Sequence, residues 1–381
     1  MMERRKNLND KFGFVVLMKI KDFIDYEQPN EYIVESDRYS SKYSTPVLTA
    51  GHSFILGYIN ENNGIYKKGP CIIFDDFTTS VHYVDFPFKV KSSAMKILTA
   101  KSNADLKYCY YLLLSLSNMP PNHKRQWIST TSEKNHLLPS IDKQISIVKQ
   151  LDLISGTIAN YTNQIENLNN LVKARFIELF GTVRENPYKY PTATLKEVCH
   201  KITDGKHGGC EQEENSGYYY IGAREIYDGE IHYDTAPQIK YTDFSKDYRR
   251  CNIEQGDMVI VNTGATIGKS AIASSSLTER TLLQKSVALI KVKPNIISAE
   301  FLRYCYMANP SMYMVESASA QPNLLLSKIN TTVIYLPPMD LQLQFADFVQ
   351  QVDKSKLAVQ QSLEKTQLLF DSLMQEYFGE N

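Results

Sequence analysis

One segment of this chain occurs twice, at Leu138 to Gly181 and again at Leu336 to Gly379. The two copies align without a gap, so every residue of the second keeps the same sequence separation from its counterpart in the first. Both copies begin with Leu-Pro, carry an Asp and a Gln soon afterwards, and end with Phe-Gly. The chain therefore contains an internal duplication.

Each copy predicts one long helix. Apolar residues recur at alternating steps of three and four, a period typical of a coiled-coil seam. About 40 residues rising ~1.5 Å each would form a rod of roughly 60 Å. Pro139 and Pro337 suit a first helical turn, and Gly181 and Gly379 suit left-handed caps at the ends. The seam positions are Leu151, Ile158, Ile165 and Val172 in the first copy and Val352, Val359, Leu363 and Phe370 in the second.

Two helices of equal length and pattern in one chain are natural partners. The sequence between them is long enough to reverse the chain, so we expect an antiparallel pair. The alternative is that each apolar stripe packs only on its own globular half.

Composition sets limits on the class of protein. A length of 381 residues suggests two or three domains, and the duplication favours two. Lys and Arg balance Asp and Glu, so no overall charge favours nucleic acid, although basic residues cluster locally, as at Lys124-Arg125 shortly before Trp127. The six cysteines form no C-x-x-C pair, which suits a reducing cytoplasm. No signal peptide or membrane-length apolar run is visible, and we expect a cytoplasmic protein without a membrane partner.

We expect an α+β fold with an internal pseudo-two-fold repeat, in which two mixed α/β domains alternate with the two long helices. The predicted boundaries are 1–137, 138–181, 182–335 and 336–381. Short strands separated by turn residues are expected at 53–58, 71–74, 86–90, 218–221, 257–261 and 287–292. Short helices are expected at 104–115 and 299–308, where Leu106 to Tyr110 resembles Leu302 to Tyr306. A globular domain plus a long helix is thus the repeating unit.

The rods keep their pattern while the domains diverge. Such a chain can hold two different recognition surfaces at a fixed separation. Double-stranded DNA is a suitable target for two surfaces at a fixed separation, because successive major-groove faces lie ~34 Å apart on one side of the duplex. The 25 tyrosines suit adaptable recognition surfaces, or are half-buried residues of sheets.

Motifs for independent chemistry are absent or incomplete. Gly264 to Ser270 has one residue too few between its glycines for a phosphate-binding P-loop, so we expect a loop between strands. Cys199, His200, His207 and Cys210 match no common zinc spacing, and no metal is expected. The Asn/Asp-Pro-Pro-aromatic loop of amino-methyltransferases is missing. We expect no catalytic residues in this chain.

An ordered set of motifs resembles a known family. The second half carries Leu195 to Val198, Asp204-Gly205-Lys206-His207, Thr266 to Lys269, Gln321 to Leu324 and Leu336-Pro337-Pro338. The first half carries Thr45 to Gly51, Ile73 to Thr78 and Phe88 to Met95. In this order they resemble the specificity (S) subunits of type I DNA restriction-modification systems, with two target-recognition domains and two spacer helices. The chain departs from the pattern at Lys206, where the family often has Thr, and the first half lacks an Asp-Gly-x-His segment.

The resemblance implies a non-catalytic subunit. Each domain would read one half of a bipartite sequence in double-stranded DNA, and the coiled coil would fix the spacer. Modification (methyltransferase) subunits would dock on the helices, and ATP-dependent restriction subunits could join them. No cofactor would belong to this chain, because S-adenosylmethionine, ATP and Mg would belong to the partners. The residues expected to contact DNA are Lys206, His207, Thr266, Lys269, Gln321 and Asn323 in the second domain and His52, Thr78 and Lys91 in the first.

Two other readings stay open at this point. One is a coiled-coil structural or adaptor protein whose diverged domains bind other proteins. Sequence-selective retention on DNA would speak against it. The other is an autonomous methyltransferase, which the missing motifs disfavour and methyl transfer by the isolated chain would support.

Overall fold

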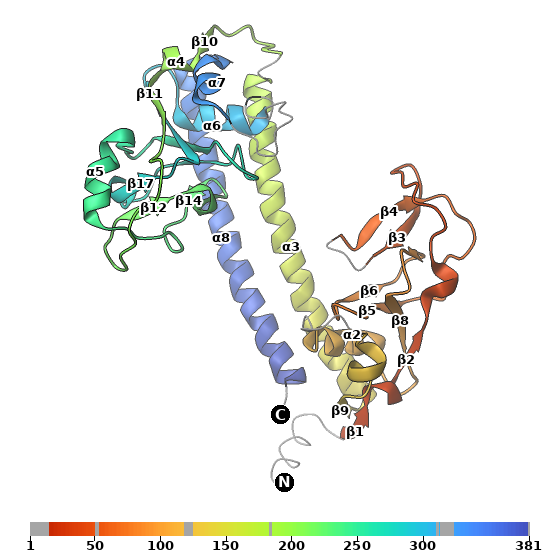
Figure 1. Cartoon of the computed structure of the whole chain (residues 1–381). Coiled ribbons are helices and arrows are strands. Elements are labelled where there is room, and N and C mark those ends of the chain that lie inside the picture. Colours follow the sequence, from red (N-terminus) through yellow and green to blue (C-terminus); the bar gives the residue numbers. More distant parts are fainter. Residues whose placement is uncertain are drawn as a thin grey trace. The chain divides into compact units, whose positions relative to one another are not determined.

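The computed structural model describes residues 15–49, 53–117, 125–182, 185–309, 312 and 324–379. The chain divides into two compact units, the first formed by Met1–Thr162 and Gln361–Asn381 and the second by Asn163–Gln360. The long helices α3 (Ile141–Phe180) and α8 (Met339–Phe378) each contribute to both units. We call the part before α3 the first domain and the part between α3 and α8 the second domain (Figure 1).

The first domain is built on a four-stranded antiparallel sheet with the order β2-β8-β5-β6. A second sheet has the order β4-β3-β7, in which β3 and β7 are parallel, and a third pairs β1 with β9. The elements are β1 (Val15–Lys19), β2 (Ile24–Glu27), β3 (Thr45–Leu48), β4 (Ile55–Ile59), β5 (Cys71–Asp75), β6 (Val81–Val84), β7 (Lys89–Val90), β8 (Met95–Ala100), α2 (Leu106–Ser115) and β9 (Asn135–Pro139).

Side chains alternate between the two faces of this central sheet along each strand, and each face packs in its own core cluster. Ile72, Phe74 and Leu98 lie in one core cluster with α2 and with the parts of α3 and α8 that belong to this unit. Ile73 and Ile97 lie in a second cluster, with Leu48 of β3 and Val90 of β7. β5 is therefore buried along its whole length, which explains its continuous apolar sequence.

The second domain has a central sheet with the order β11-β18-β15-β16, and β12 pairs in parallel with β17. A third pair joins β10 to β19. The elements are β10 (Thr192–Thr194), α4 (Leu195–Val198), β11 (Cys199–Asp204), β12 (Tyr219–Ile221), β13 (Ile226–Tyr227), β14 (Glu230–Ile231), α5 (Tyr241–Cys251), β15 (Met258–Val261), β16 (Ser270–Ile272), β17 (Thr281–Leu283), β18 (Val287–Val292), α6 (Ala299–Ala308), α7 (Leu326–Thr331) and β19 (Val333–Tyr335).

The two domains share one topology. The central strands β2, β8, β5 and β6 correspond in chain order and pairing to β11, β18, β15 and β16. The parallel pair β3 and β7 corresponds to β12 and β17, and the flanking pair β1 and β9 corresponds to β10 and β19. α2 and α6 occupy the same place in the order. The duplication seen in the long helices therefore extends through both domains.

The predicted match between Leu106 to Tyr110 and Leu302 to Tyr306 is out of structural register. α2 is capped by Asp105, whose side chain accepts a hydrogen bond from the amide of Tyr108. α6 is capped by Ser298, which accepts from Phe301 in the same way. The caps make Tyr108 the counterpart of Phe301, so the similar sequences are displaced by nearly one helical turn. Both helices bury most of their circumference, and neighbouring turns therefore have similar composition.

The long helices pack against each other in opposite directions in both units. In the first unit, the Tyr377 hydroxyl near the end of α8 donates to Gln150 Oε1 near the start of α3 (2.6 Å). In the second, Phe176 and Phe180 near the end of α3 contact Phe345 near the start of α8, at ring-centroid distances of 5.4 and 5.6 Å. This confirms the predicted antiparallel pairing.

The predicted seam residues lie on the inner side of this pair to different degrees. Leu151, Val172 and Val352 are buried, and Phe370 packs on the core of the first unit. Ile158, Ile165, Val359 and Leu363, nearer the middle of the helices, are half-buried.

The helix ends correct two details of the prediction. Gly181 has the expected left-handed conformation, with φ +71°, but Gly379 is not among the residues with positive φ. The amide of Gly379 instead donates to Gln375 O (2.9 Å), which continues the helical hydrogen-bond pattern. Pro139 and Pro337 precede the first helical residues, Ile141 and Met339, because the preceding chain is still extended there.

All six cysteines are free thiols. In the part of the chain that the structure describes, no helix combines the length and apolar character that crossing a membrane requires.

Candidate nucleic-acid interface

Several connecting segments meet at one end of the central sheet of the second domain. β11 ends at Asp204, opposite Ala288 of β18. At the same end β15 finishes at Val261, opposite Val287, and β16 begins at Ser270. We call the segments 205–208, 262–269 and 284–286 the second loop edge.

Two predicted contact residues, Lys206 and His207, directly follow β11. The Lys206 side chain is 14% exposed and pairs with Asp247 on α5. This hydrogen bond raises the pKa of the Lys206 ammonium. His207 is 53% exposed, and its Nε2 lies 2.9 Å from Asp204 Oδ2. His207 is thus presented to solvent, whereas Lys206 mainly fastens the segment to α5.

Arg250 on α5 holds the same segment from its other side. Its Nε lies 3.0 Å from the carbonyl oxygens of both Asp204 and Gly205, and its Nη2 pairs with Asp204 Oδ1. Burial alone would raise the pKa of Asp204, but the hydrogen bonds and charges of Arg250 and His207 outweigh burial and lower that pKa. Asp204 therefore stays ionised at neutral pH and orients the side chains of both Arg250 and His207.

Thr266 and Lys269 lie in the connection between β15 and β16. The amide of Lys269 donates to Thr266 O (3.2 Å). Gly264 and Gly268, with φ of +100° and +89°, let this connection turn sharply. The Lys269 side chain is exposed and forms no ion pair with another described residue. The prediction of a loop between strands, rather than a P-loop opening a helix, is confirmed.

Gln321 and Asn323 lie outside the described residues. The next residue, Leu324, is buried, and its amide donates to Asn262 O (2.7 Å). Asn262 directly follows β15, and its own amide donates to Ser286 O (2.9 Å). The chain therefore returns to the second loop edge immediately after Asn323.

The first domain has the corresponding first loop edge, where β2 and β5 end and β6 and β8 begin. We define it as residues 28, 76–80, 91–94 and 125–127. Thr78 lies in the β5–β6 turn, where its hydroxyl donates to Asp75 Oδ1 (2.8 Å). The place of Thr78 is thus topologically that of Thr266 and Lys269.

Lys91 precedes β8 at the first loop edge. Its ammonium pairs with Asp37 and lies 5.9 Å from the centroid of the Tyr39 ring. The side chain is 38% exposed, so it remains accessible beside these partners. His52, the other residue predicted in this domain, lies outside the described residues.

The sequence did not identify the groups that hold the second loop edge in place. In the sequence, Arg250 is simply one residue of the basic pair Arg249-Arg250, and Asp247 belongs to no motif. Both residues bind partners that are distant in the sequence, so their role could not be predicted. Their position opposite the Asp-Gly-Lys-His segment emerges only when α5 packs beside β11 and β17. Within the described ranges, no group of three or more His, Cys, Asp or Glu side chains is arranged to bind a metal.

Comparison with known proteins shows which family the second domain resembles. Residues 187–368 match the family model for the type I restriction modification DNA specificity domain. The specificity subunit of the type I restriction enzyme EcoR124I/EcoR124II from Escherichia coli is 44% identical over 161 residues. That alignment covers 39% of this chain and only 40% of the E. coli protein.

Solved structures extend the likeness to nearly the whole chain. The S subunit of a type I restriction-modification system from M. genitalium aligns with a TM-score of 0.62 at 16% identity, over 97% of both chains. A chain from a study of complex assembly and conformational transition of the type I R-M system aligns with a TM-score of 0.52 at 15% identity, over 96% of this chain and 97% of that one. Residues 187–368 therefore belong to the type I restriction modification DNA specificity domain family, and the chain as a whole has the fold of a type I specificity subunit.

Proposed function

We propose that this chain is the DNA-binding specificity subunit of a type I restriction-modification complex. Each domain reads one half of a bipartite sequence in double-stranded DNA through its loop edge, and the antiparallel helices fix the length of the unread spacer. The chain itself is non-catalytic. His207, Thr266, Lys269, Gln321 and Asn323 contact DNA in one half, with Lys206 contributing if its pair with Asp247 opens, and His52, Thr78 and Lys91 contact it in the other.

The observation that carries the proposal is the repeated topology. One fold is used twice, and the two loop edges differ in sequence: Gln28-Pro29 follows β2 on the first edge, whereas Gly205-Lys206-His207 follows β11 on the second. A repeated scaffold with different loop side chains suits two different sequences, because hydroxyl and ammonium groups recognise base edges and phosphates.

Modification (methyltransferase) subunits dock on the long helices, and restriction subunits join this complex. S-adenosylmethionine, ATP and Mg belong to those partners. The support is the fold of a type I specificity subunit and the exposed apolar residues on both helices. Leu171 and Leu369, which occupy equivalent positions in the two repeats, are 48% and 51% exposed.

Sequence-selective DNA binding tests the proposal. Complexes assembled with the neighbouring modification subunit are incubated with a library of random duplexes, and the retained duplexes are sequenced. We expect enrichment of one bipartite sequence with a fixed spacer. Retention that is independent of sequence, or absent while the subunits assemble, would favour the adaptor reading.

A further inference from the structure

Arg125 and Gln126 on the first loop edge correspond to Asn323 and Leu324, the last two residues of the Gln-Pro-Asn-Leu motif of the second domain. Asp76 follows β5 as Asn262 follows β15: its amide donates to Ala94 O (3.0 Å), and its carbonyl accepts from the amide of Gln126 (2.8 Å). In the second domain Asn262 O accepts from Leu324. Gln126 is therefore the counterpart of Leu324, which makes Arg125 the positional counterpart of Asn323.

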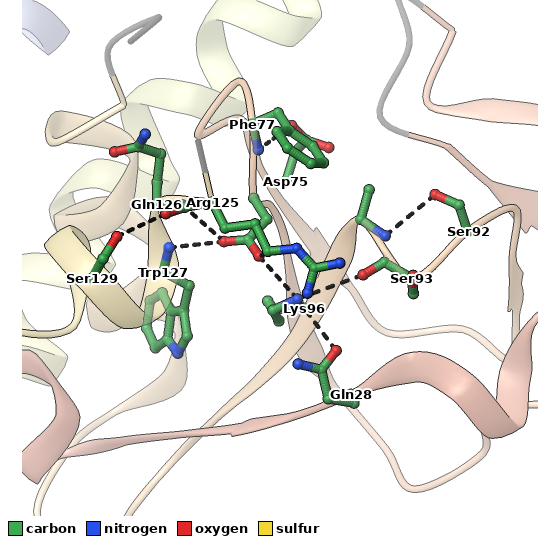
Figure 2. Close-up of polar contacts among 12 residues, drawn as sticks. Gln28, Asp75, Phe77, Ser92, Ser93, Lys96, Arg125, Gln126, Trp127 and Ser129 are labelled. Carbon is green, nitrogen blue, oxygen red and sulfur yellow. Dashed lines mark hydrogen bonds and ion pairs between the residues drawn. The ribbon is translucent and has the colours of Figure 1, made fainter. Parts of the chain in front are cut away.

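The main chain around Arg125 is fixed by a buried carboxylate. Asp76 is 1% exposed, and its Oδ1 accepts hydrogen bonds from the amides of Gln126 (3.0 Å) and Trp127 (2.8 Å). Its Oδ2 lies 3.0 Å from the ammonium of Lys96, which is fully buried. Ser129 Oγ donates to Arg125 O (2.7 Å). Figure 2 shows Lys96, Arg125, Gln126, Trp127 and Ser129 close together at this loop edge.

The Trp127 side chain anchors the segment to the domain. The indole is 1% exposed and packs against Phe74 of β5 with ring centroids 5.2 Å apart. Trp127 begins a short π-helix, Trp127–Thr131. Arg125, two residues before this anchor, consequently has a defined backbone position on the loop edge.

The Arg125 side chain is itself accessible. It is 57% exposed, and its Nε lies 4.0 Å from Asp76 Oδ2. Its terminal nitrogens have no ion-pair partner in the described part of the chain. An exposed guanidinium of this kind can donate a bidentate pair of hydrogen bonds, for which guanine O6 and N7 are the matching acceptors in the major groove.

We propose that Arg125 is a specificity-determining DNA contact of the first domain, with Asp76 as its positioning residue. This inference rests on the proposed function of the chain and adds a residue to its site. It explains why a basic pair precedes the tryptophan at this point. The first domain thus uses an arginine where the second carries Asn323.

The test uses the assembled complex of the full chain with its modification subunit. The target is first defined by the retained-duplex experiment. Affinities are then measured for duplexes with the target intact, with either half scrambled, and with both halves scrambled. We expect Arg125→Gln to weaken binding to the intact target about tenfold or more. The loss should persist when one half is scrambled and disappear when the other is.

Matched variants separate base reading from charge and folding. Lys67→Gln removes one exposed positive charge near the start of β5, at the opposite end of the sheet, and should change binding less than about twofold. Arg125→Lys keeps the charge but not the bidentate geometry, so discrimination should still fall. Thermal unfolding should be the same for all of these chains, because the Arg125 side chain is exposed.

Two results would overturn the inference: unchanged affinity of Arg125→Gln for the intact target, or an equal loss on all four duplexes. If the parent complex retained no preferred sequence in the first step, the proposed function would fail before any variant was made. Failure of the inference is therefore distinguishable from failure of the function.

Discussion

Gly205 shows how closely the second loop edge is built against its neighbours. A Cβ on this residue would lie 2.2 Å from the carbonyl oxygen of Leu283 and 2.3 Å from that of Gln284. The amide of Lys206 donates to the same Leu283 carbonyl (2.7 Å). The glycine therefore allows the Asp-Gly-Lys-His segment to lie against β17. Glycine is needed here because of this close contact, and not because of the backbone conformation.

Replacing Gly205 by Ala should displace this segment, because backbone atoms cannot move aside as a flexible side chain can. We expect a loss of about 1 to 3 kcal/mol in the free energy of unfolding, measured by urea denaturation, together with weaker binding to the selected duplex. Gly209→Ala is the control, since a Cβ there meets no atom within 4 Å. Equal stability of the two variants would show that the close approach is not needed.

His136 makes the stability of the first domain depend on pH in the acid range. Burial lowers the pKa of its imidazole from the ordinary value of 6.5 to about 4, and its Nε2 lies 2.7 Å from the Tyr108 hydroxyl. Because the folded-state pKa lies below the unfolded one, the unfolded chain binds more protons between these values. Stability is therefore fully present above pH 6.5 and falls as pH decreases toward 4, by up to about 1.4 kcal/mol per unit.

Thermal unfolding of the parent and of His136→Gln at pH 7 and pH 5 tests this. The parent should lose more stability than the variant over that interval. His200→Gln, which removes an exposed imidazole, should behave like the parent. An identical pH response of parent and His136→Gln would show that protonation of His136 does not limit stability.

At the scale of elements, helices and strands with long sequence patterns were predicted better than those with short ones. The long helices were predicted within a few residues, because a seam repeated over many turns can belong to no other structure. The expected strand 287–292 and helix 299–308 are confirmed as β18 and α6. The pairs β1 with β9 and β10 with β19 were missed, because short strands are stabilised by partners distant in sequence.

The junction between each long helix and its domain uses a buried glutamine, and the repeat made this position visible in the sequence. Gln342 is fully buried; its Oε1 accepts from the amide of Ser298 (2.9 Å), and its Nε2 donates to Pro337 O (2.9 Å). Gln144 makes the equivalent bonds to Asp105 (2.8 Å) and Pro139 (2.8 Å). The sequence showed the repetition of Asp and Gln but not this role, which depends on the cap of α6 or α2.

Gln342→Ala should destabilise the second unit by roughly 1 to 3 kcal/mol for each buried backbone group left unpaired. Gln144→Ala should do the same in the first unit. The exposed Gln367 of α8, which donates to Asp371 (3.0 Å), provides the control on the same helix, and its replacement by Ala should cost less than about 0.5 kcal/mol. Urea unfolding curves in which Gln342→Ala and Gln367→Ala coincide would contradict this role.

At the scale of the whole molecule, the sequence indicated the plan of the chain more fully than the identity of its contacts. Duplicated helices and ordered motifs were sufficient to predict two domains of one kind. Which side chains face outward on a loop edge depends on pairs such as Lys206 with Asp247, which form only when the domain folds. Arg125 likewise acquires significance only when Gln126 is seen to correspond to Leu324.

The measurement that tests the central claim most directly is single-molecule methylation mapping of DNA. Cells carrying this chain and its neighbouring modification subunit are compared with cells that lack only this chain. We predict adenine methylation at one bipartite sequence that disappears without the chain, and exchange of the first domain should change one half of that sequence alone. An unchanged methylation pattern, with the modification subunit shown to be active, would contradict the account.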